Sequence, residues 1–182
     1  MRRPHVLTLL VSLLLGLTAC TGEVDSVYSN YKAHFEFENV SGVTPLNSAV
    51  NNAGVFCRIW RTADYFYFQD GQGNLQPYPV MATDAYRVWE AIDGFIVGTT
   101  NIPDIGTGQL TLVAYDLACP NCYTESLIER RLDFDSEGTV HCGRCQRTYD
   151  LNNFGLASGN GGGRSLFRYR VYYSGNRLVV QN

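Results

Sequence analysis

Runs of alternating apolar and polar residues, divided by turn residues, fill the chain from Tyr31 onward. Val, Phe and Tyr are frequent in these runs, and a period of two in such residues is typical of half-buried β-strands. The pattern predicts ten strands: Tyr31–Glu38, Gly54–Trp60, Tyr65–Gln69, Tyr86–Glu90, Gly94–Gly98, Gln109–Tyr115, Leu127–Phe134, Arg147–Leu151, Ser165–Tyr173 and Arg177–Val180. Helical periodicity is scarce, and a turn or two of helix is expected only near Ala82–Trp89. We therefore predict an all-β fold.

Two features within the predicted strands fit an ordinary β core. The aromatic run Tyr65–Phe68 can form a ligand-binding surface, but a core buried on both sides of the strand explains it more simply. In the run Val55–Trp60, alternation turns one of two sets inward, either Val55, Cys57 and Ile59 or Phe56 and Trp60. A lone cysteine in a strand is most often a small buried apolar residue, so we expect Cys57 in the core.

The first 20 residues have the pattern of an export signal. Arg2 and Arg3 supply a positive region, Val6–Leu17 an apolar region and Leu17–Cys20 a cleavage site. The cleavage site resembles a bacterial lipobox, which implies lipidation of Cys20 after removal of residues 1–19. The apolar run is shorter than the roughly 20 residues of a spanning helix. We expect a protein anchored by lipid on the extracytoplasmic side of a bacterial envelope membrane, with residues 20–30 as a flexible tether.

Four of the six cysteines form two Cys-x-x-Cys pairs, Cys119 with Cys122 and Cys142 with Cys145. Four soft thiolates at this spacing are typical of a tetrahedral sulfur site for zinc or of an iron–sulfur cluster. We expect one hairpin to carry both pairs, each in a tight turn. Proline after the first ligand presets φ, and Gly143 lets amides approach a sulfur closely.

Oxidation to disulfides is the alternative for these cysteines, because thiols outside the cytoplasm oxidise. Either pair can close a short loop, or the two pairs can be cross-linked to each other. A disulfide framework does not require two matched four-residue turns, so the pattern favours a metal or cluster. His141, next to Cys142, is interpreted as a neighbour and not as a ligand.

The charge balance and histidine count limit the functions open to the chain. Without Arg2 and Arg3, 12 Lys and Arg face 17 Asp and Glu, a net charge of −5. This balance argues against a nucleic-acid partner, which requires a basic surface. Only His34 and His141 follow the signal, and neither lies in a nucleophile motif, so we do not expect an enzyme.

The last third of the chain resembles a known family in the order of its residues. After the two cysteine pairs come Tyr149-Asp150-Leu151, Gly155, Leu166, Tyr169, Val171, Gly175, Leu178 and Val180. This order is similar to that of the Rieske iron–sulfur domain over roughly Leu110–Gln181. In that family two ligand loops hold a [2Fe-2S] cluster, and a final hairpin returns the chain to a base β domain. The resemblance implies a Rieske-like antiparallel sandwich or barrel.

The chain departs from that family in its ligands. Cys122 and Cys145 stand where the resemblance implies two histidines, and the first loop is one residue longer. Thiolate in place of imidazole lowers the potential of a cluster and equally suits a closed, structural zinc site.

Three functions remain open at this point. The first is a membrane-anchored binding or accessory module, residues 31–182, with structural zinc in a zinc-ribbon-like subdomain over 118–146. The second is an electron-transfer protein that carries [2Fe-2S] on the same four cysteines and meets a redox partner at the membrane. The third is an interaction domain held by disulfides.

Overall fold

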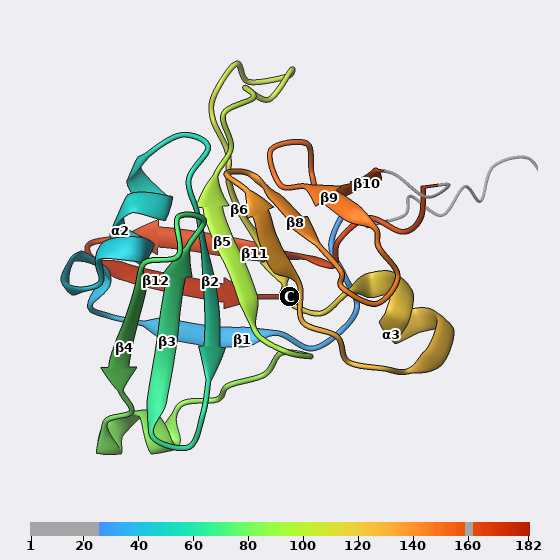
Figure 1. Ribbon diagram of the computed structural model, residues 1–182. Coiled ribbons are helices and arrows are strands. Elements are labelled where there is room, and N and C mark those ends of the chain that lie inside the picture. Colours follow the sequence, from blue (N-terminus) through green and yellow to red (C-terminus); the bar gives the residue numbers. More distant parts are fainter. Residues whose placement is uncertain (1–25, 159–161) are drawn as a thin grey trace, which may run out of the picture.

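Two antiparallel β-sheets make up most of the computed structural model, which describes residues 26–158 and 162–182 (Figure 1). The larger sheet has eight strands, in spatial order β1 (His34–Phe37), β12 (Arg177–Gln181), β11 (Arg168–Ser174), β6 (Leu112–Asp116), β5 (Phe95–Thr99), β2 (Phe56–Arg61), β3 (Tyr65–Asp70) and β4 (Leu75–Pro79). The smaller sheet has four, in the order β10 (Leu156–Ser158), β9 (Thr148–Asp150), β8 (Thr139–His141) and β7 (Asp133–Ser136). The helical elements are η2 (Val40–Gly42), α2 (Thr44–Asn51), η3 (Ala82–Tyr86) and α3 (Pro120–Ser126). The mostly-β class is confirmed.

The large sheet curls on itself around a first hydrophobic core. Phe37 on β1 and Phe68 on β3 have ring centroids 4.9 Å apart, although five strands separate β1 from β3 in the sheet. A flat sheet cannot bring these rings together, so the strands must wrap round a common interior. Helix α2 contributes buried Leu46 and Ala49 to the same core.

A second core lies on the opposite face of β2, β5 and β6. Phe56, Ile96 and Tyr115 point to this face and pack with Val140 and Tyr149 of the small sheet. Cys57 and Val97, their neighbours along the strands, face the first core. Both alternative inward faces of the Val55–Trp60 run are therefore buried, and Cys57 is a core residue, as predicted.

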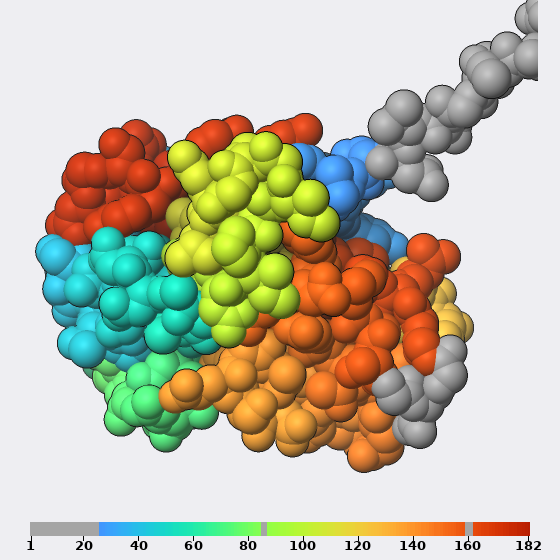
Figure 2. Space-filling model, turned by 90° about the horizontal axis from the view of Figure 1, so that it is seen from above, coloured from blue at the N-terminus to red at the C-terminus, as the bar shows by residue number. Residues whose placement is uncertain are grey.

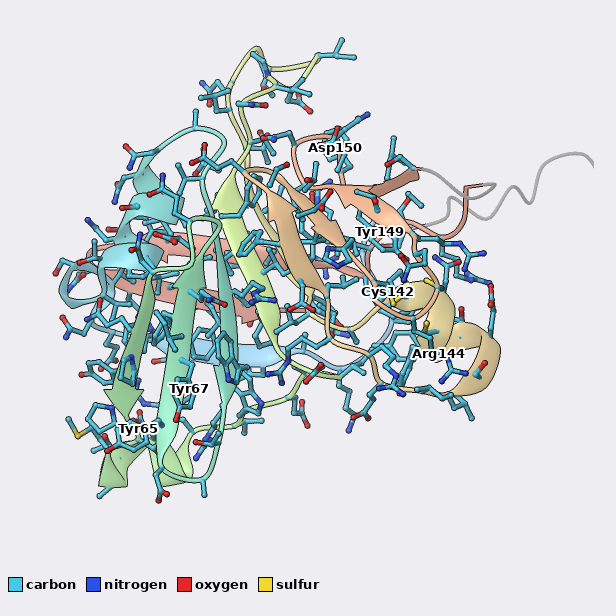
Figure 3. All side chains as sticks on the ribbon, viewed as in Figure 1. Tyr65, Tyr67, Cys142, Arg144, Tyr149 and Asp150 are labelled. Atoms are coloured by element: carbon cyan, nitrogen blue, oxygen red, sulfur yellow. The ribbon has the colours of Figure 1, made fainter. Side chains whose placement is uncertain are left out.

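The aromatic run of β3 divides between the two faces of the sheet. Phe66 and Phe68 are buried in the first core, whereas Tyr65 is 43% exposed on the other face. Figure 3 shows Tyr65 and Tyr67 on β3, well away from Cys142. The core explanation is right for the phenylalanines and wrong for Tyr65.

The two α-helices are the largest departure from the predicted elements. Helix α2 has eight residues and buries Leu46, Ala49 and Val50, an amphipathic spacing too short to stand out among Thr, Asn and Ser. Pro120 is the first residue of α3, where proline is favoured because no amide is needed there. The short 3₁₀ element η3 lies in the one stretch where helix was expected.

Several strand predictions need correction. Tyr86–Glu90 is not a strand, and only an isolated bridge joins Glu90 to His34. Most of Leu127–Phe134 is irregular, since β7 begins at Asp133. Strands β4, β8 and β10 were not predicted. Strand β4 contains Pro77 and Pro79, which are tolerated because it is an edge strand.

The loop between β5 and β6 projects from the body of the molecule. It stands at the top of Figure 1 and faces the viewer in Figure 2, beside the orange surface of the small sheet. Ile102, Ile105 and Leu110 are exposed on it, and Asp104 orders its tip by accepting hydrogen bonds from the amides of Gly106 and Thr107.

The described chain begins close to β11. The amide of Ser29 donates to the carbonyl of Arg168 at 2.8 Å, and the guanidinium of Arg170 lies 4.6 Å from the centre of the Tyr28 ring. The C-terminal part of the predicted tether thus rests on the domain. The predicted signal and Cys20 lie outside the described residues. Within residues 26–158 and 162–182, none of the helices has the length and apolar character needed to cross a membrane.

Candidate metal centre

The sulfurs of Cys119, Cys122, Cys142 and Cys145 all lie within 4.8 Å of one another, near α3 in Figure 3. The closest pairs are Cys119 with Cys145 at 3.6 Å and Cys122 with Cys142 at 3.7 Å. Four sulfurs at about 2.3 Å from one tetrahedral zinc ion are about 3.8 Å apart, so the group can hold a single metal ion. A disulfide bond is about 2.05 Å long, and all four cysteines are free.

The first cysteine pair lies at the start of a helix and not in the tight turn that we predicted. Cys119 is the N-cap of α3, and Cys122 lies in its first turn. The carbonyl of Cys119 accepts from the amide of Tyr123 at 3.0 Å. The helix start places both sulfurs on one side of the chain, and its free amides favour a thiolate at Cys119.

The second pair does occupy a tight turn, between β8 and β9. The amide of Gln146 donates to the carbonyl of Cys142 at 2.9 Å, and the amide of Cys142 donates to the carbonyl of Arg147 at 2.9 Å. Gln146, with φ of 58°, takes the left-handed conformation of this turn. A side chain at Gly143 would meet no atom within 4 Å, so the close approach expected of this glycine is not required.

The predicted hairpin between the two pairs is present: β7 pairs antiparallel with β8, α3 with the first pair precedes β7, and the second pair follows β8. A short antiparallel contact brings the first pair to the second. The amide of Cys119 donates to the carbonyl of Arg130 at 2.7 Å, and the amide of Leu132 donates to the carbonyl of Leu117 at 2.9 Å. The small sheet continues through β9 and β10 to Ser158, beyond the predicted limit of 146.

Tyr149 contacts a cysteine of the site, a role that the sequence did not indicate. Its hydroxyl lies 3.2 Å from the sulfur of Cys119 and accepts a hydrogen bond from the side-chain amide of Asn121 at 2.9 Å. Because Asn121 donates to the tyrosine oxygen, the hydroxyl proton is free to point at the sulfur. Tyr149 is fully buried. It is therefore placed to stabilise a thiolate at Cys119.

Burial acts to raise the pKa of three of these thiols, and the neighbouring groups decide whether the net shift is up or down. Burial raises the pKa of Cys119 and, together with the neighbouring sulfurs, the pKa of Cys122. Burial also opposes ionisation of Cys145, but the Arg147 amide, the Cys119 and Cys142 sulfurs and the Arg147 guanidinium lower its pKa to about 7. A bound cation would replace the thiol protons, so metal binding at this site must release protons.

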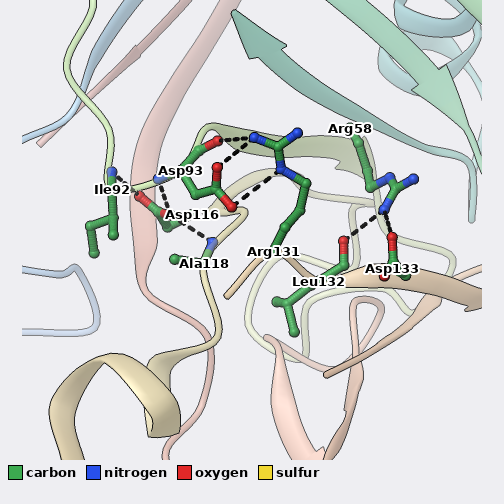
Figure 4. Close-up of polar contacts among 8 residues, drawn as sticks. All are labelled: Arg58, Ile92, Asp93, Asp116, Ala118, Arg131, Leu132 and Asp133. Carbon is green, nitrogen blue, oxygen red and sulfur yellow. Dashed lines mark hydrogen bonds and ion pairs between the residues drawn. The ribbon is translucent and has the colours of Figure 1, made fainter. Parts of the chain in front are cut away.

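Two arginines join the metal-site region to the large sheet (Figure 4). Arg58 on β2 donates to the carbonyl of Leu132 and to the carboxylate of Asp133, both at 2.7 Å. Arg131 donates to the carboxylate of Asp93, with a shortest distance of 2.5 Å. Both guanidiniums lie over the ring of Trp60, at 5.9 and 5.3 Å from its centre.

A buried carboxylate lies three residues before the first ligand. Asp116 is fully buried and accepts hydrogen bonds from the amides of Ile92, Asp93 and Ala118, as Figure 4 shows, and from the hydroxyl of Tyr169. Burial raises its pKa to about 6, although all four donors favour the ionised form. Asp116 thereby ties the end of β6 to the segment that leads into Cys119.

The remaining residues singled out from the sequence lie outside the sulfur group. Cys57 is buried in the first core, and burial raises its pKa well above the usual range of a thiol. His141 follows the predicted role of a neighbour, and its buried Nδ1 has no hydrogen-bond partner within the described chain. Comparisons of the chain with protein-family models, with curated proteins and with solved structures found no match. The function is therefore argued from the site itself.

Proposed function

We propose that this protein is a membrane-anchored accessory module of the bacterial envelope, built around a structural zinc ion held by Cys119, Cys122, Cys142 and Cys145. The observation that carries the proposal is the mutual spacing of the four sulfurs, all within 4.8 Å. Thiolates are the preferred ligands of structural zinc sites, which are four-coordinate and closed.

The sulfur spacing favours one ion over the alternative [2Fe-2S] cluster. In such a cluster each iron takes two of the thiolates, and sulfurs on different irons are separated by the whole iron–sulfide core. Four sulfurs around one ion are instead equally close to each other. The cross-pair distances of 3.6 and 3.7 Å fit two sulfurs on one metal in either centre, and it is the mutual closeness of all four sulfurs, within 4.8 Å, that favours a single ion.

A structural role follows from closure and burial. Four thiolates leave zinc no open position for water or substrate, so the ion supplies no Lewis-acid chemistry. Cys119 and Cys142 are fully buried, and Cys122 is 5% exposed. In this role the metal holds α3, the β8–β9 turn and the segment near Arg130 together.

Membrane attachment is proposed from the sequence of the first 20 residues. The positive region, the short apolar region and Cys20 support a lipid anchor, and we propose an envelope protein as the class of partner that such an anchored module would meet. The acidic balance of the chain supports a partner other than nucleic acid.

We further propose that the domain has the plan of a Rieske domain adapted to a different metal site. Two observations support this part of the proposal. Strands β11 and β12 return the chain to the large sheet after the metal loops. Tyr149, from the Tyr-Asp-Leu run that carries the resemblance, contacts the first ligand.

Metal analysis of protein purified from its native envelope tests the centre. We expect one equivalent of zinc and no visible absorption, because zinc has a filled d shell. A red-brown preparation with two equivalents of iron would instead identify a cluster, and four thiolates should then give a potential toward about −400 mV. A preparation without metal, whose thiols are oxidised, would refute both metal assignments.

A matched pair of variants tests the structural role. Cys142→Ser should lose the metal and expose the segment 118–146 to limited proteolysis while β2 and β5 stay protected. Cys57→Ala, which removes a buried thiol outside the sulfur group, should keep the metal and the protection of that segment. Equal protection of the segment in the two variants would refute the structural role.

A further inference from the structure

Three arginines line one shallow pocket beside the metal centre. Arg130, Arg131 and Arg144 form it together with Asp133 and Gly143, and its volume is about 460 Å³. The chain as a whole carries a net charge of −3. The pocket is therefore locally positive, opposite in sign to the net charge of the protein.

Two of the three guanidiniums have no internal counter-charge. Arg131 is paired with Asp93, and the carboxylate of Asp133 is engaged by Arg58. Arg130 and Arg144 are exposed, and neither forms an ion pair with any residue in 26–158 or 162–182. The charge of these two side chains is available to a ligand.

The backbone positions of the pocket arginines depend on the metal loops. The carbonyl of Arg130 accepts from the amide of Cys119 at 2.7 Å, and an isolated β-bridge joins Arg131 to Ala118. Arg144 lies between Cys142 and Cys145 in the second loop. A metal ion that joins the two cysteine pairs would also bring these arginines together from separate segments.

We propose that this pocket binds a phosphate group. A guanidinium presents N–H donors in a planar fork that fits phosphate oxygens, and such charge-assisted bonds are stronger than neutral ones. A phosphate dianion also matches the two unpaired guanidiniums in charge, which a single carboxylate does not. The group can come from free phosphate or from the phosphodiester of a lipid headgroup. The diester carries a single negative charge, but both sources present non-bridging phosphate oxygens to the guanidinium fork.

The competing role for Arg130 and Arg144 is to neutralise the metal centre. A zinc ion with four thiolates carries a net charge of −2, and nearby arginines can offset it without any further ligand. The pocket proposal rests on the proposed metal centre in one respect: the metal would hold together the two segments that carry Arg130 and Arg144. Metal content and phosphate binding are therefore measured on the same preparation.

Isothermal titration of the metal-loaded full-length protein with inorganic phosphate tests the proposal, with the ionic strength held constant within each titration. We expect saturable binding, and we expect the affinity to fall between titrations at low and at high salt, because the pocket is exposed. The double substitution Arg130→Gln/Arg144→Gln should weaken binding at least about tenfold, since it removes two charge-assisted contacts. Arg164→Gln/Arg170→Gln removes the same charge from two exposed residues outside the pocket and should leave binding unchanged.

A second titration, with the soluble headgroup diester glycerophosphoglycerol, separates the two sources. Tighter binding of the diester identifies a lipid headgroup, and tighter binding of inorganic phosphate identifies the free anion. In the unsubstituted protein, the side-chain Nε–H signals of Arg130 and Arg144 should shift on addition of the tighter ligand. These signals test the pocket even if the double variant folds poorly.

Three results would overturn the pocket proposal. They are no binding by metal-loaded protein, equal weakening in both double variants, and loss of metal from Arg130→Gln/Arg144→Gln with phosphate affinity unchanged. The last result would assign the arginines to the metal centre. Absence of metal from the native protein would count against the proposed function and is seen separately by elemental analysis.

Discussion

The hydroxyl of Tyr149 lies 3.2 Å from the sulfur of Cys119, although 30 residues separate the two along the chain. The contact joins strand β9 to the cap of α3, and Asn121 fixes its direction by donating to the tyrosine oxygen. A hydrogen bond to a ligating sulfur disperses its negative charge and orients it toward the metal.

Tyr149→Phe should therefore weaken metal binding by about tenfold or more, because the outer partner of a ligand is removed while its ring remains. Competition with a chromophoric chelator measures this affinity. Tyr115→Phe is the matched control, since the buried hydroxyl of Tyr115 donates to the carbonyl of Leu151 and not to a sulfur. Equal affinities in the two variants would show that Tyr149 only fills space.

Removing the metal should loosen the small sheet before the large one. Strands β7 and β8 have only four and three residues, and α3 is capped by a ligand, so these elements depend on the metal more than the large sheet does. Strand β5 is buried between both cores and should keep its amide protection. Hydrogen exchange with and without a chelator measures the difference, and uniform loss of protection in both sheets would contradict it.

Arg58→Met should lower the free energy of unfolding by about 1.5–3 kcal/mol, because it removes charge-assisted bonds to Leu132 and Asp133 from a side chain only 12% exposed. Arg177→Met removes the ion pair with Glu36, and Arg177 is 52% exposed, so a loss below about 1 kcal/mol is expected. Urea unfolding of both variants measures the difference. A smaller effect at Arg58 than at Arg177 would be the contrary result.

Asp116 should titrate near pH 6 in the folded protein, against about 3.9 in an unfolded chain. The folded state thus holds one more proton than the unfolded state between about pH 4 and 6. The contribution of Asp116 to stability is therefore full below about pH 4 and is lost as the pH rises through 6. Carboxyl-carbon NMR measures the pKa directly, and a midpoint below 4 would contradict the effect of burial.

The stability of the protein relative to Asp116→Asn should change accordingly with pH. The variant lacks this titration, so the difference in free energy of unfolding should shift in favour of Asp116 by up to about 3 kcal/mol as the pH falls from 6.5 to 4. Urea unfolding of both proteins at several pH values measures the shift. A constant difference over this range would be inconsistent with a raised pKa.

The strands of the large sheet could be predicted because they alternate with a period of two and are rich in Val, Phe and Tyr. Strand β4 escaped prediction since Pro77 and Pro79 normally argue against a strand, and only its place at the edge permits them. Helix α3 escaped because Pro120 after Cys119 suits both a turn and the first residue of a helix.

The four ligands could be predicted because their spacing is local, whereas their surroundings are set by tertiary pairing. Tyr149 was noticed only within a family pattern, and nothing local indicates that it meets Cys119. Asp116 has no distinguishing neighbours in the sequence. Its role depends on Tyr169, which strand pairing brings from 53 residues away.

The prolines of β4 also bear on self-association. One edge of the large sheet ends in this strand, and two of its five residues lack an amide hydrogen. A strand from another molecule that paired with this edge would find no amide donor at the two prolines, so it could form only some of the backbone hydrogen bonds of a regular antiparallel pair. The two prolines therefore oppose the addition of further strands at β4, and with it the growth of fibres from this edge. They do so although Tyr65 and Leu75, on the face beside this edge, are exposed to solvent.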